Sequence, residues 1–245
     1  MPLISEPKQL CHPLRIERFA RNTVGRDLIV GDVHGHFGRL RKALDRIGFS
    51  ERFDRLFCLG DLVDRGPDSL EAFEWLDRPW FHSILGNHER AALDWARGEL
   101  DEDLYATNGG EWNIDVPATL MQDRAAIFAK LPVAIELETA AGLVGLVHAD
   151  VPSASWEEFR QQLRMDSSRP HGERRTLDGA VNSRRRFRGG IGGPVAGVHA
   201  VVVGHTRVGK ARWSSNVLCI ETGGWIDGHV TIVDAATLTP AVRAR

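Results

Sequence analysis

The chain has 245 residues, of which 42% are hydrophobic and 26% charged, and its formal net charge is −2. These values are ordinary for a soluble globular protein, and they give no general attraction to nucleic acid or to an anionic membrane. No apolar run approaches the roughly 18 residues that span a bilayer, and the N-terminus lacks the basic and apolar segments of a signal peptide.

The three cysteines are an odd number without C-x-x-C spacing, which argues against a disulfide framework. Cys58 and Cys219 lie inside apolar runs, and we expect both to be buried small hydrophobic residues. The reducing cytoplasm is the compartment that fits this cysteine usage.

The first hundred residues alternate between short apolar runs and helical spacing. Residues 1–25 have weak periodicity and predict a partly ordered lead-in, followed by a single domain over residues 26–245. The pattern then predicts strands at 26–31, 54–59 and 81–85, and helices at 37–47, 69–76 and 89–97. This order predicts right-handed βαβαβ units and a mostly parallel sheet.

The second half is less regular. We expect a helix over 117–131, a hairpin of strands 133–139 and 143–147, a helix over 155–163, and strands at 198–203, 217–221 and 230–233. Residues 165–195 are polar, basic and glycine-rich, and they predict a long surface loop. The expected fold is α/β, with two sheets packed as a β-sandwich and helices on the outside.

Five predicted strands end in a polar cluster. These clusters supply Asp32, His34, Asp61, Asn87, His148 and His205. Ligands bind at the carboxyl ends of parallel strands, so we expect the clusters to converge. One aspartate after a strand is most often a helix cap, but repetition at five strand ends favours a metal site. Oxygen and imidazole ligands suit Mn²⁺, Fe or Zn²⁺ better than Ca²⁺.

The same segments carry a family resemblance. Residues 31–35 (GDVHG), 60–66 (GDLVDRG) and 86–89 (GNHE), then His148 and residues 204–206 (GHT), resemble the motifs of the PPP family of metallophosphoesterases. The bacterial and phage branch of protein phosphatases is the most similar part of that family. The resemblance implies a central β-sandwich flanked by helices, with two divalent metal ions at its edge.

By this resemblance, Asp32 and His34 would bind one metal ion, Asn87, His148 and His205 would bind the other, and Asp61 would bridge the two. Mn²⁺ is the expected metal, with Fe and Zn²⁺ as alternatives. Two neighbouring cations lower the pKa of a shared water and neutralise phosphate oxygens, so water can attack an anionic ester. His88 would be the general acid, held in orientation by Asp64.

Three residues would contact phosphate: Arg65, Asn87 and Arg184. Relatives carry a tryptophan just before the position of Arg184, and its loss here leaves the register open by one or two residues. We expect Arg185, Arg186 and Arg188 to lie in a solvated loop. Residues 108–112 (NGGEW) predict either part of the rim of the site or a turn with a packed tryptophan.

The expected activity is hydrolysis of phosphoserine and phosphothreonine in proteins or peptides, with phosphotyrosine as a further substrate. The alternative is a dinucleoside polyphosphate hydrolase of the diadenosine tetraphosphate type, which shares the motifs. That branch usually has glutamine in place of the histidine of the first motif, so His34 argues against it. A scaffold that binds phosphorylated partners without hydrolysis would be expected to lack a ligand, and none is missing.

Overall fold

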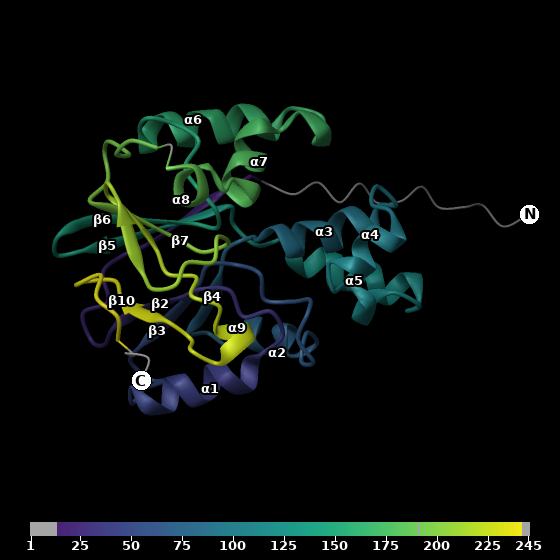
Figure 1. Ribbon diagram of the computed structural model, residues 1–245, viewed down its shortest axis with the longest axis horizontal. Helices are drawn as coiled ribbons and strands as arrows, with labels where there is room; N and C mark the ends of the chain where they lie inside the picture. Colours follow the sequence, from purple (N-terminus) through teal and green to yellow (C-terminus); the bar gives the residue numbers. More distant parts are fainter. Residues whose placement is uncertain (1–13, 191, 242–245) are drawn as a thin grey trace, which may run out of the picture.

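The computed structural model describes residues 14–190 and 192–241, and its strands form two mixed sheets that pack face to face (Figure 1). The larger sheet has the order β1-β5-β6-β7-β9-β8, with strands at Ile16–Phe19, Ala134–Thr139, Gly142–Val147, Ala200–Val203, Val217–Cys219 and Arg212–Ser214. The smaller sheet has the order β10-β2-β3-β4, with strands at Ile232–Asp234, Asp27–Val30, Arg55–Cys58 and Phe81–Ser83. The expected two-sheet α/β sandwich is therefore confirmed.

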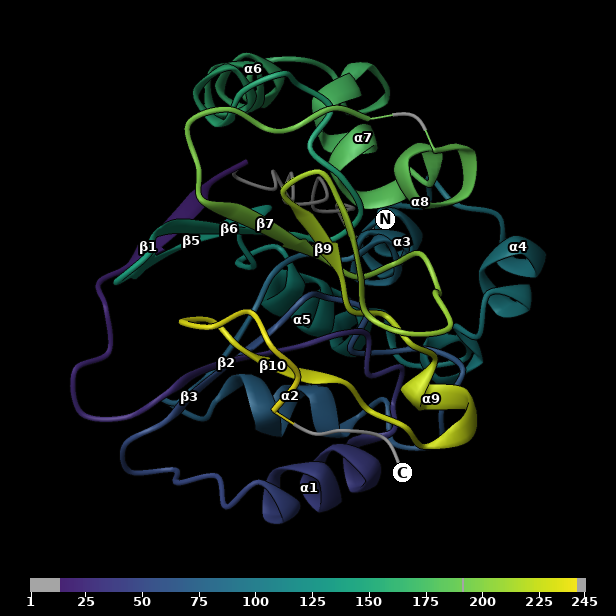
Figure 2. The same cartoon turned by 60° about the vertical axis from the view of Figure 1, so that its left-hand side comes forward.

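Helices cover both outer faces of the sandwich (Figures 1 and 2). The smaller sheet is covered by α1 (Phe37–Arg46) and α2 (Glu71–Leu76), and the larger sheet by α6 (Trp156–Ser167), α7 (Arg175–Asn182) and α8 (Arg185–Gly189). A helical lobe projects from one end; it consists of α3 (Asn87–Ala96), α4 (Glu102–Thr107), η1 (Glu111–Asn113) and α5 (Ala118–Phe128). Two short helices complete the set, η2 (His171–Glu173) and α9 (Gly224–Asp227). Among the described residues, no helix is long and apolar enough to cross a membrane.

The hydrophobic core is built around strands that are buried on both of their faces. On β3, Phe57 belongs to the apolar cluster between the sheets, whereas Leu56 and Cys58 belong to the cluster beneath the helices. On β7, Val202 and Val201 divide between the same two clusters. Successive side chains of a strand point to opposite faces, so a strand covered on both sides requires apolar residues throughout.

Parallel pairing brings the polar strand ends to one edge of the sandwich. β2, β3 and β4 run parallel, with Leu28 opposite Leu56 and Phe57 opposite His82, as the βαβαβ prediction requires. β6 and β7 also run parallel, with Leu146 opposite Val202. The predicted hairpin is confirmed as the antiparallel pair β5–β6, and the expected burial of Cys58 and Cys219 is confirmed as well. Cys11 lies outside the described residues.

Two expectations about local structure are wrong. The sequence predicts no strand before Arg26, yet β1 pairs in parallel with β5 at the sheet edge. Its pattern is weak because its middle residues are exposed. Residues 165–195 are not one long loop, since they contain the end of α6 and all of α7 and α8. The Asp166 carboxylate on α6 accepts hydrogen bonds from the backbone N–H groups of Thr176 and Leu177, a cap from outside the helix that its own sequence does not reveal.

A buried carboxylate anchors the start of the smaller sheet. Asp54 accepts hydrogen bonds from the backbone N–H of Arg26 at 2.8 Å, from its guanidinium at 2.6 Å, and from the N–H of Ser50 at 3.0 Å. Burial opposes the charged form, but the hydrogen bonds from Arg26 and Ser50 outweigh it and lower the pKa of Asp54. The charged form therefore stabilises the fold above the unfolded-state pKa of about 3.9 and ceases to do so as the pH falls through the lower folded-state value.

We predict that Asp54→Asn lowers the free energy of unfolding by about 2 kcal/mol at pH 7, because buried N–H groups lose a charged acceptor and Arg26 is partly exposed. Urea unfolding measures the loss, and the difference from wild type shrinks at about pH 3. Asp45→Asn, at an exposed position of α1, is the matched control. Equal stability of the two variants would contradict the anchoring role.

Candidate metal centre

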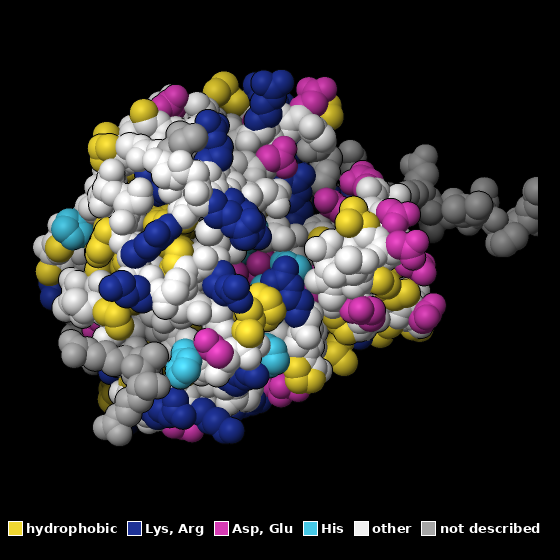
Figure 3. Space-filling view, in the orientation of Figure 1, with side chains coloured by type: hydrophobic (Ala, Val, Ile, Leu, Met, Phe, Trp, Pro, Cys, Tyr) yellow, Lys and Arg dark blue, Asp and Glu magenta, His cyan; other side chains and the backbone are white. Residues whose placement is uncertain are grey.

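The residues at the five strand ends meet in one place. Asp32, His34, Asp61, His148 and His205 are all buried, with at most 7% of their surface exposed, and Asn87 is partly buried. Acidic and histidine side chains show at the bottom of a hollow in the surface, and lysine and arginine side chains surround it (Figure 3). The predicted convergence is therefore observed for all six residues.

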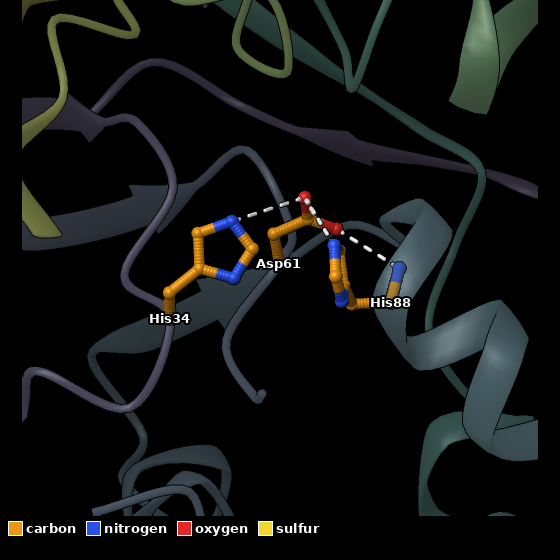
Figure 4. A group of neighbouring side chains, drawn as sticks. All are labelled: His34, Asp61 and His88. Atoms are coloured by element: carbon orange, nitrogen blue, oxygen red, sulfur yellow. Dashed lines mark hydrogen bonds and ion pairs between the residues drawn. The ribbon is translucent and has the colours of Figure 1, made fainter. Parts of the chain in front are cut away.

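Two groups of side chains that could hold a metal ion share Asp61. His34, Asp61 and His88 form one group, and Asp61, His148 and His205 form the other. Asp61 Oδ2 lies 3.6 Å from His34 Nε2 and 3.4 Å from His148 Nε2. Figure 4 shows the Asp61 carboxylate between the rings of His34 and His88. A single carboxylate thus faces both groups.

The second group brings side-chain atoms that could bind a metal ion close together. His148 Nδ1 lies 2.6 Å from the carbonyl of Leu59 and His205 Nε2 lies 3.1 Å from that of Asn182, so both atoms are donors. In the neutral rings, the form that binds a metal ion, the opposite nitrogens are His148 Nε2 and His205 Nδ1, which lie 3.2 Å apart. Asn87 Oδ1 is 3.0 Å from His148 Nε2. Backbone carbonyls that fix the far nitrogen are typical of metal-binding histidines, so this donor set fits a divalent cation.

The first group is completed by Asp32. Its Oδ2 atom lies 4.0 Å from His34 Nε2, and its Oδ1 atom accepts the backbone N–H of His205 at 3.1 Å. His34 Nδ1 lies 3.1 Å from the carbonyl of Val63, which leaves Nε2 facing both carboxylates. Two carboxylates and an imidazole around one point suit a divalent first-row metal ion.

Buried carboxyl groups are concentrated here. Burial raises the pKa of Asp32 well above its usual range, and the neighbouring Glu221 and Asp61 act in the same direction. Burial also raises the pKa of Glu221 and of Glu89 to about 7. Several carboxylates withdrawn from water repel one another, and cations bound among them would relieve that repulsion.

The backbone of the site is strained. Among the described residues, eight non-glycine positions have positive φ, and five of them are predicted site residues: His34 (45°), Asp61 (51°), Asp64 (71°), Arg65 (69°) and His205 (58°). Each such residue costs about 1–3 kcal/mol and persists only where its surroundings enforce the conformation. Hydrogen bonds within the site help to hold these conformations. The Asp61 carbonyl accepts the backbone N–H groups of both Val33 and His34.

Glu89 holds the loop that carries Asp61. It is fully buried and accepts hydrogen bonds from the backbone N–H groups of Asp61 (2.9 Å), Leu62 (2.7 Å) and Gly86 (2.9 Å). Glu89 has no role among the residues predicted from the sequence. Its position three residues after Gly86, at the start of α3, is the spacing of a capping box and could have revealed it. Gly86 itself cannot carry a side chain, because a Cβ there would overlap the Asp61 carboxylate.

His88 and Asp64 form the pair that the motifs predict. His88 Nδ1 lies 2.6 Å from Asp64 Oδ2, and both side chains are buried. Burial disfavours charge on the imidazole, but the carboxylates of Asp61 and Asp64 outweigh this and raise the pKa of His88. The raised pKa favours the protonated ring near neutral pH, as a general acid requires.

Two arginines lie beside the site. Arg65 Nη1 lies 2.9 Å from His34 Nε2 and Nη2 lies 2.8 Å from His88 Nε2, and the guanidinium lies 4.8 Å from the centre of the Trp225 ring. Arg184 Nη1 donates to the carbonyl of His205 at 2.9 Å. Trp225, on α9, also packs edge-on against His34, a contact that the sequence does not predict because no motif contains this residue.

The expectation for Arg186 is wrong. Its side chain is 5% exposed and donates to Asp150 Oδ1 at 2.8 Å and to the carbonyl of Gly193 at 2.7 Å. Arg186 therefore ties its segment to the residue that lies two positions after His148. Arg185 and Arg188 are exposed, as expected.

The two-sheet sandwich, with a donor set for divalent cations at the edge where its strands end, defines a class of protein. The family model of the calcineurin-like phosphoesterases matches residues 26–208 of the chain. The protein belongs to the calcineurin-like phosphoesterase family, and is therefore a hydrolase of phosphoesters.

Several named proteins are similar to the chain. Serine/threonine-protein phosphatase 2 of Salmonella typhimurium is 32% identical over 209 residues, which cover 83% of this chain and 89% of that protein. Serine/threonine-protein phosphatase 1 of the same organism is 32% identical over 207 residues, with the same coverage. The symmetrical bis(5'-nucleosyl)-tetraphosphatase of Coxiella burnetii is 40% identical, but over 91 residues that cover 36% of this chain and 29% of that protein.

Solved structures agree on the fold. A protein serine/threonine phosphatase from Saccharomyces cerevisiae matches with a TM-score of 0.58 at 18% identity, over 92% of this chain and 78% of that one. A cold-active protein-tyrosine phosphatase from Shewanella matches with a TM-score of 0.56 at 14% identity, over 92% of this chain and 79% of that one.

We predict that Glu89→Gln weakens binding of divalent metal ions about 10–100-fold, because its amide nitrogen cannot accept the backbone N–H groups that position Asp61. Calorimetric titration of the chelator-treated protein with Mn²⁺ measures the affinity. Glu74→Gln, at an exposed position of α2, is the control and should bind as wild type does. Unchanged affinity in Glu89→Gln would show that the loop keeps its geometry without the carboxylate.

Proposed function

We propose that the protein is a metal-dependent phosphomonoesterase that hydrolyses phosphoserine and phosphothreonine in proteins, with phosphotyrosine as a further substrate. The observation that carries the proposal is the pair of ligand groups that meet at Asp61, with Arg65 and Arg184 beside them. The names of the Salmonella relatives, which match over 83% of the chain, support a protein substrate.

In this proposal, Asp32, His34 and Asp61 hold one divalent ion, and Asp61, Asn87, His148 and His205 hold the other. Mn²⁺ is the proposed metal, because oxygen and imidazole ligands are combined. Bound at these positions, the ions would supply an activated water and positive charge opposite the phosphate oxygens.

The remaining residues bind the phosphate and handle the proton. Arg65 and Arg184 lie beside the site, and planar guanidinium groups suit the oxygens of a phosphate. Asn87, beside them, is a further proposed phosphate contact. His88 would donate a proton from Nε2 to the alcohol oxygen as the P–O bond breaks, since its Nδ1 atom is engaged by Asp64. Asp64 is the positioning residue for that ring.

The alternative substrate is a dinucleoside polyphosphate. It is favoured by the similarity to the Coxiella tetraphosphatase, which is confined to 91 residues. His34 argues against it, because that branch of the family usually carries glutamine there. We also propose a cytoplasmic location, which the two buried free thiols, Cys58 and Cys219, support.

We predict that the chelator-treated protein regains activity with Mn²⁺ and then cleaves phosphoserine and phosphothreonine peptides at least about tenfold faster, in kcat/KM, than diadenosine tetraphosphate. Phosphate release from the peptides and chromatography of the nucleotides give the two rates. Samples without added metal are the control. A higher kcat/KM for the dinucleotide would contradict the protein-phosphatase proposal and support the alternative.

A further inference from the structure

The Asp64 carboxylate has a second partner on the helical lobe. Trp112, in η1, donates its indole Nε1–H to Asp64 Oδ1 at 2.6 Å. The other oxygen, Oδ2, lies 2.6 Å from His88 Nδ1. Each oxygen of a fully buried carboxylate therefore has its own donor, one from the lobe and one from the proposed general acid.

We propose that Trp112 is a positioning residue of the hydrolytic reaction, because it fixes the Asp64 carboxylate and thereby the ring of His88. The proposal rests on the proposed function and adds a residue to it. An aspartate on an imidazole Nδ1 sets the tautomer and direction of the ring only while the carboxylate itself is held. The indole N–H prevents the carboxylate from rotating away from His88.

Trp112 is itself held in place. The guanidinium of Arg124, on α5, lies 5.2 Å from the centre of its ring, and the ring of Phe73, on α2, lies 6.3 Å away. Arg124 also donates to Asn113 Oδ1 at 2.8 Å, next to Trp112 in the chain. The indole of Trp112 is thus held in place by α5 of the lobe and by α2, which covers the sandwich.

The segment before Trp112 contacts the loop that carries Asp64 and Arg65. The carbonyl of Gly109 accepts the backbone N–H of Arg65 at 3.3 Å. Gly109 has a φ of +97°, and a Cβ there would overlap the Arg65 backbone. Residues 108–112 therefore contact two of the strained residues of the loop, Asp64 and Arg65, which goes beyond a turn around a packed tryptophan.

Two substrates with different leaving groups distinguish a positioning role of Trp112 from a purely structural role. When water attacks a phosphoserine, the P–O bond breaks, the serine oxygen takes the proton from His88 Nε2, and serine and inorganic phosphate result. A p-nitrophenolate leaving group is stable as the anion and departs without that proton. Misplacement of His88 should therefore slow cleavage of the phosphopeptide far more than cleavage of p-nitrophenyl phosphate.

We predict that Trp112→Phe, which keeps an aromatic ring but removes the N–H, lowers kcat/KM for a phosphoserine peptide about tenfold. That is part of the ~10²–10⁴-fold that a positioned general acid contributes. The rate with p-nitrophenyl phosphate and the bound Mn²⁺ should stay within about twofold of wild type. His88→Asn should show the same selectivity with a larger loss.

Trp95→Phe is the matched control. Trp95 lies in the same lobe and donates its indole N–H to the carbonyl of Asn113 at 3.3 Å, away from Asp64. It should cleave both substrates as wild type does. An equal loss on both substrates in Trp112→Phe, or no loss on the peptide, would overturn the positioning role.

An NMR measurement tests the positioning role of Trp112 without catalysis, so the result does not depend on the proposed function. The imidazole proton that His88 shares with Asp64 should give a downfield ¹H NMR signal that is absent in His88→Asn. In Trp112→Phe the signal should shift or broaden, and in Trp95→Phe it should not change. An unchanged signal in Trp112→Phe contradicts the inference, whereas wild-type protein inactive on both substrates contradicts the proposed function.

Discussion

The Asp61 carboxylate lies between two sets of imidazoles, 3.6 Å from His34 Nε2 on one side and 3.4 Å from His148 Nε2 on the other. Burial opposes a charge on Asp61, but the neighbouring His148 and His88 outweigh it and keep its pKa well below the usual range. A negative charge is thereby maintained at the centre of the site. The parallel pairing of the strands, and the loops that follow them, all serve to bring ligands to this one group.

Holding Asp61 there requires a backbone that an isolated peptide would not adopt. Positive φ angles at His34, Asp61 and Asp64 are imposed by hydrogen bonds between the loops that follow β2 and β3 and by the buried Glu89. Strain of about 1–3 kcal/mol at each position is offset by the sandwich core, which fixes where the loops begin and end. The sheets therefore fix the position of the site. The helical lobe helps to fix His88, because Trp112 contacts Asp64 and Asp64 contacts His88.

The alternation of apolar runs and helical spacing was sufficient to predict the βαβαβ start, the hairpin and the two sheets, because strands buried on both faces are continuously apolar. It was insufficient for β1, which has half-exposed residues, and for α7, whose N-terminus is capped by Asp166 from another helix. Short motifs identified the residues that converge, and their metal-binding and catalytic roles remain predictions. The sequence singled out the segment that contains Trp112, but it could not predict the contacts of Trp112 with Asp64, of Trp225 with His34 or of Arg186 with Asp150. Each of these contacts joins segments far apart in the chain.

The proposed site requires one carboxylate, Asp61, to join two metal ions. Electron paramagnetic resonance of the Mn²⁺-loaded protein tests it most directly, since ions about 3.5–4 Å apart and bridged by a common ligand are magnetically coupled. We expect two Mn²⁺ ions per chain with a coupled spectrum, and loss of the coupling in Asp61→Asn. A single bound ion, two uncoupled ions, or a coupled spectrum that survives in Asp61→Asn would contradict it.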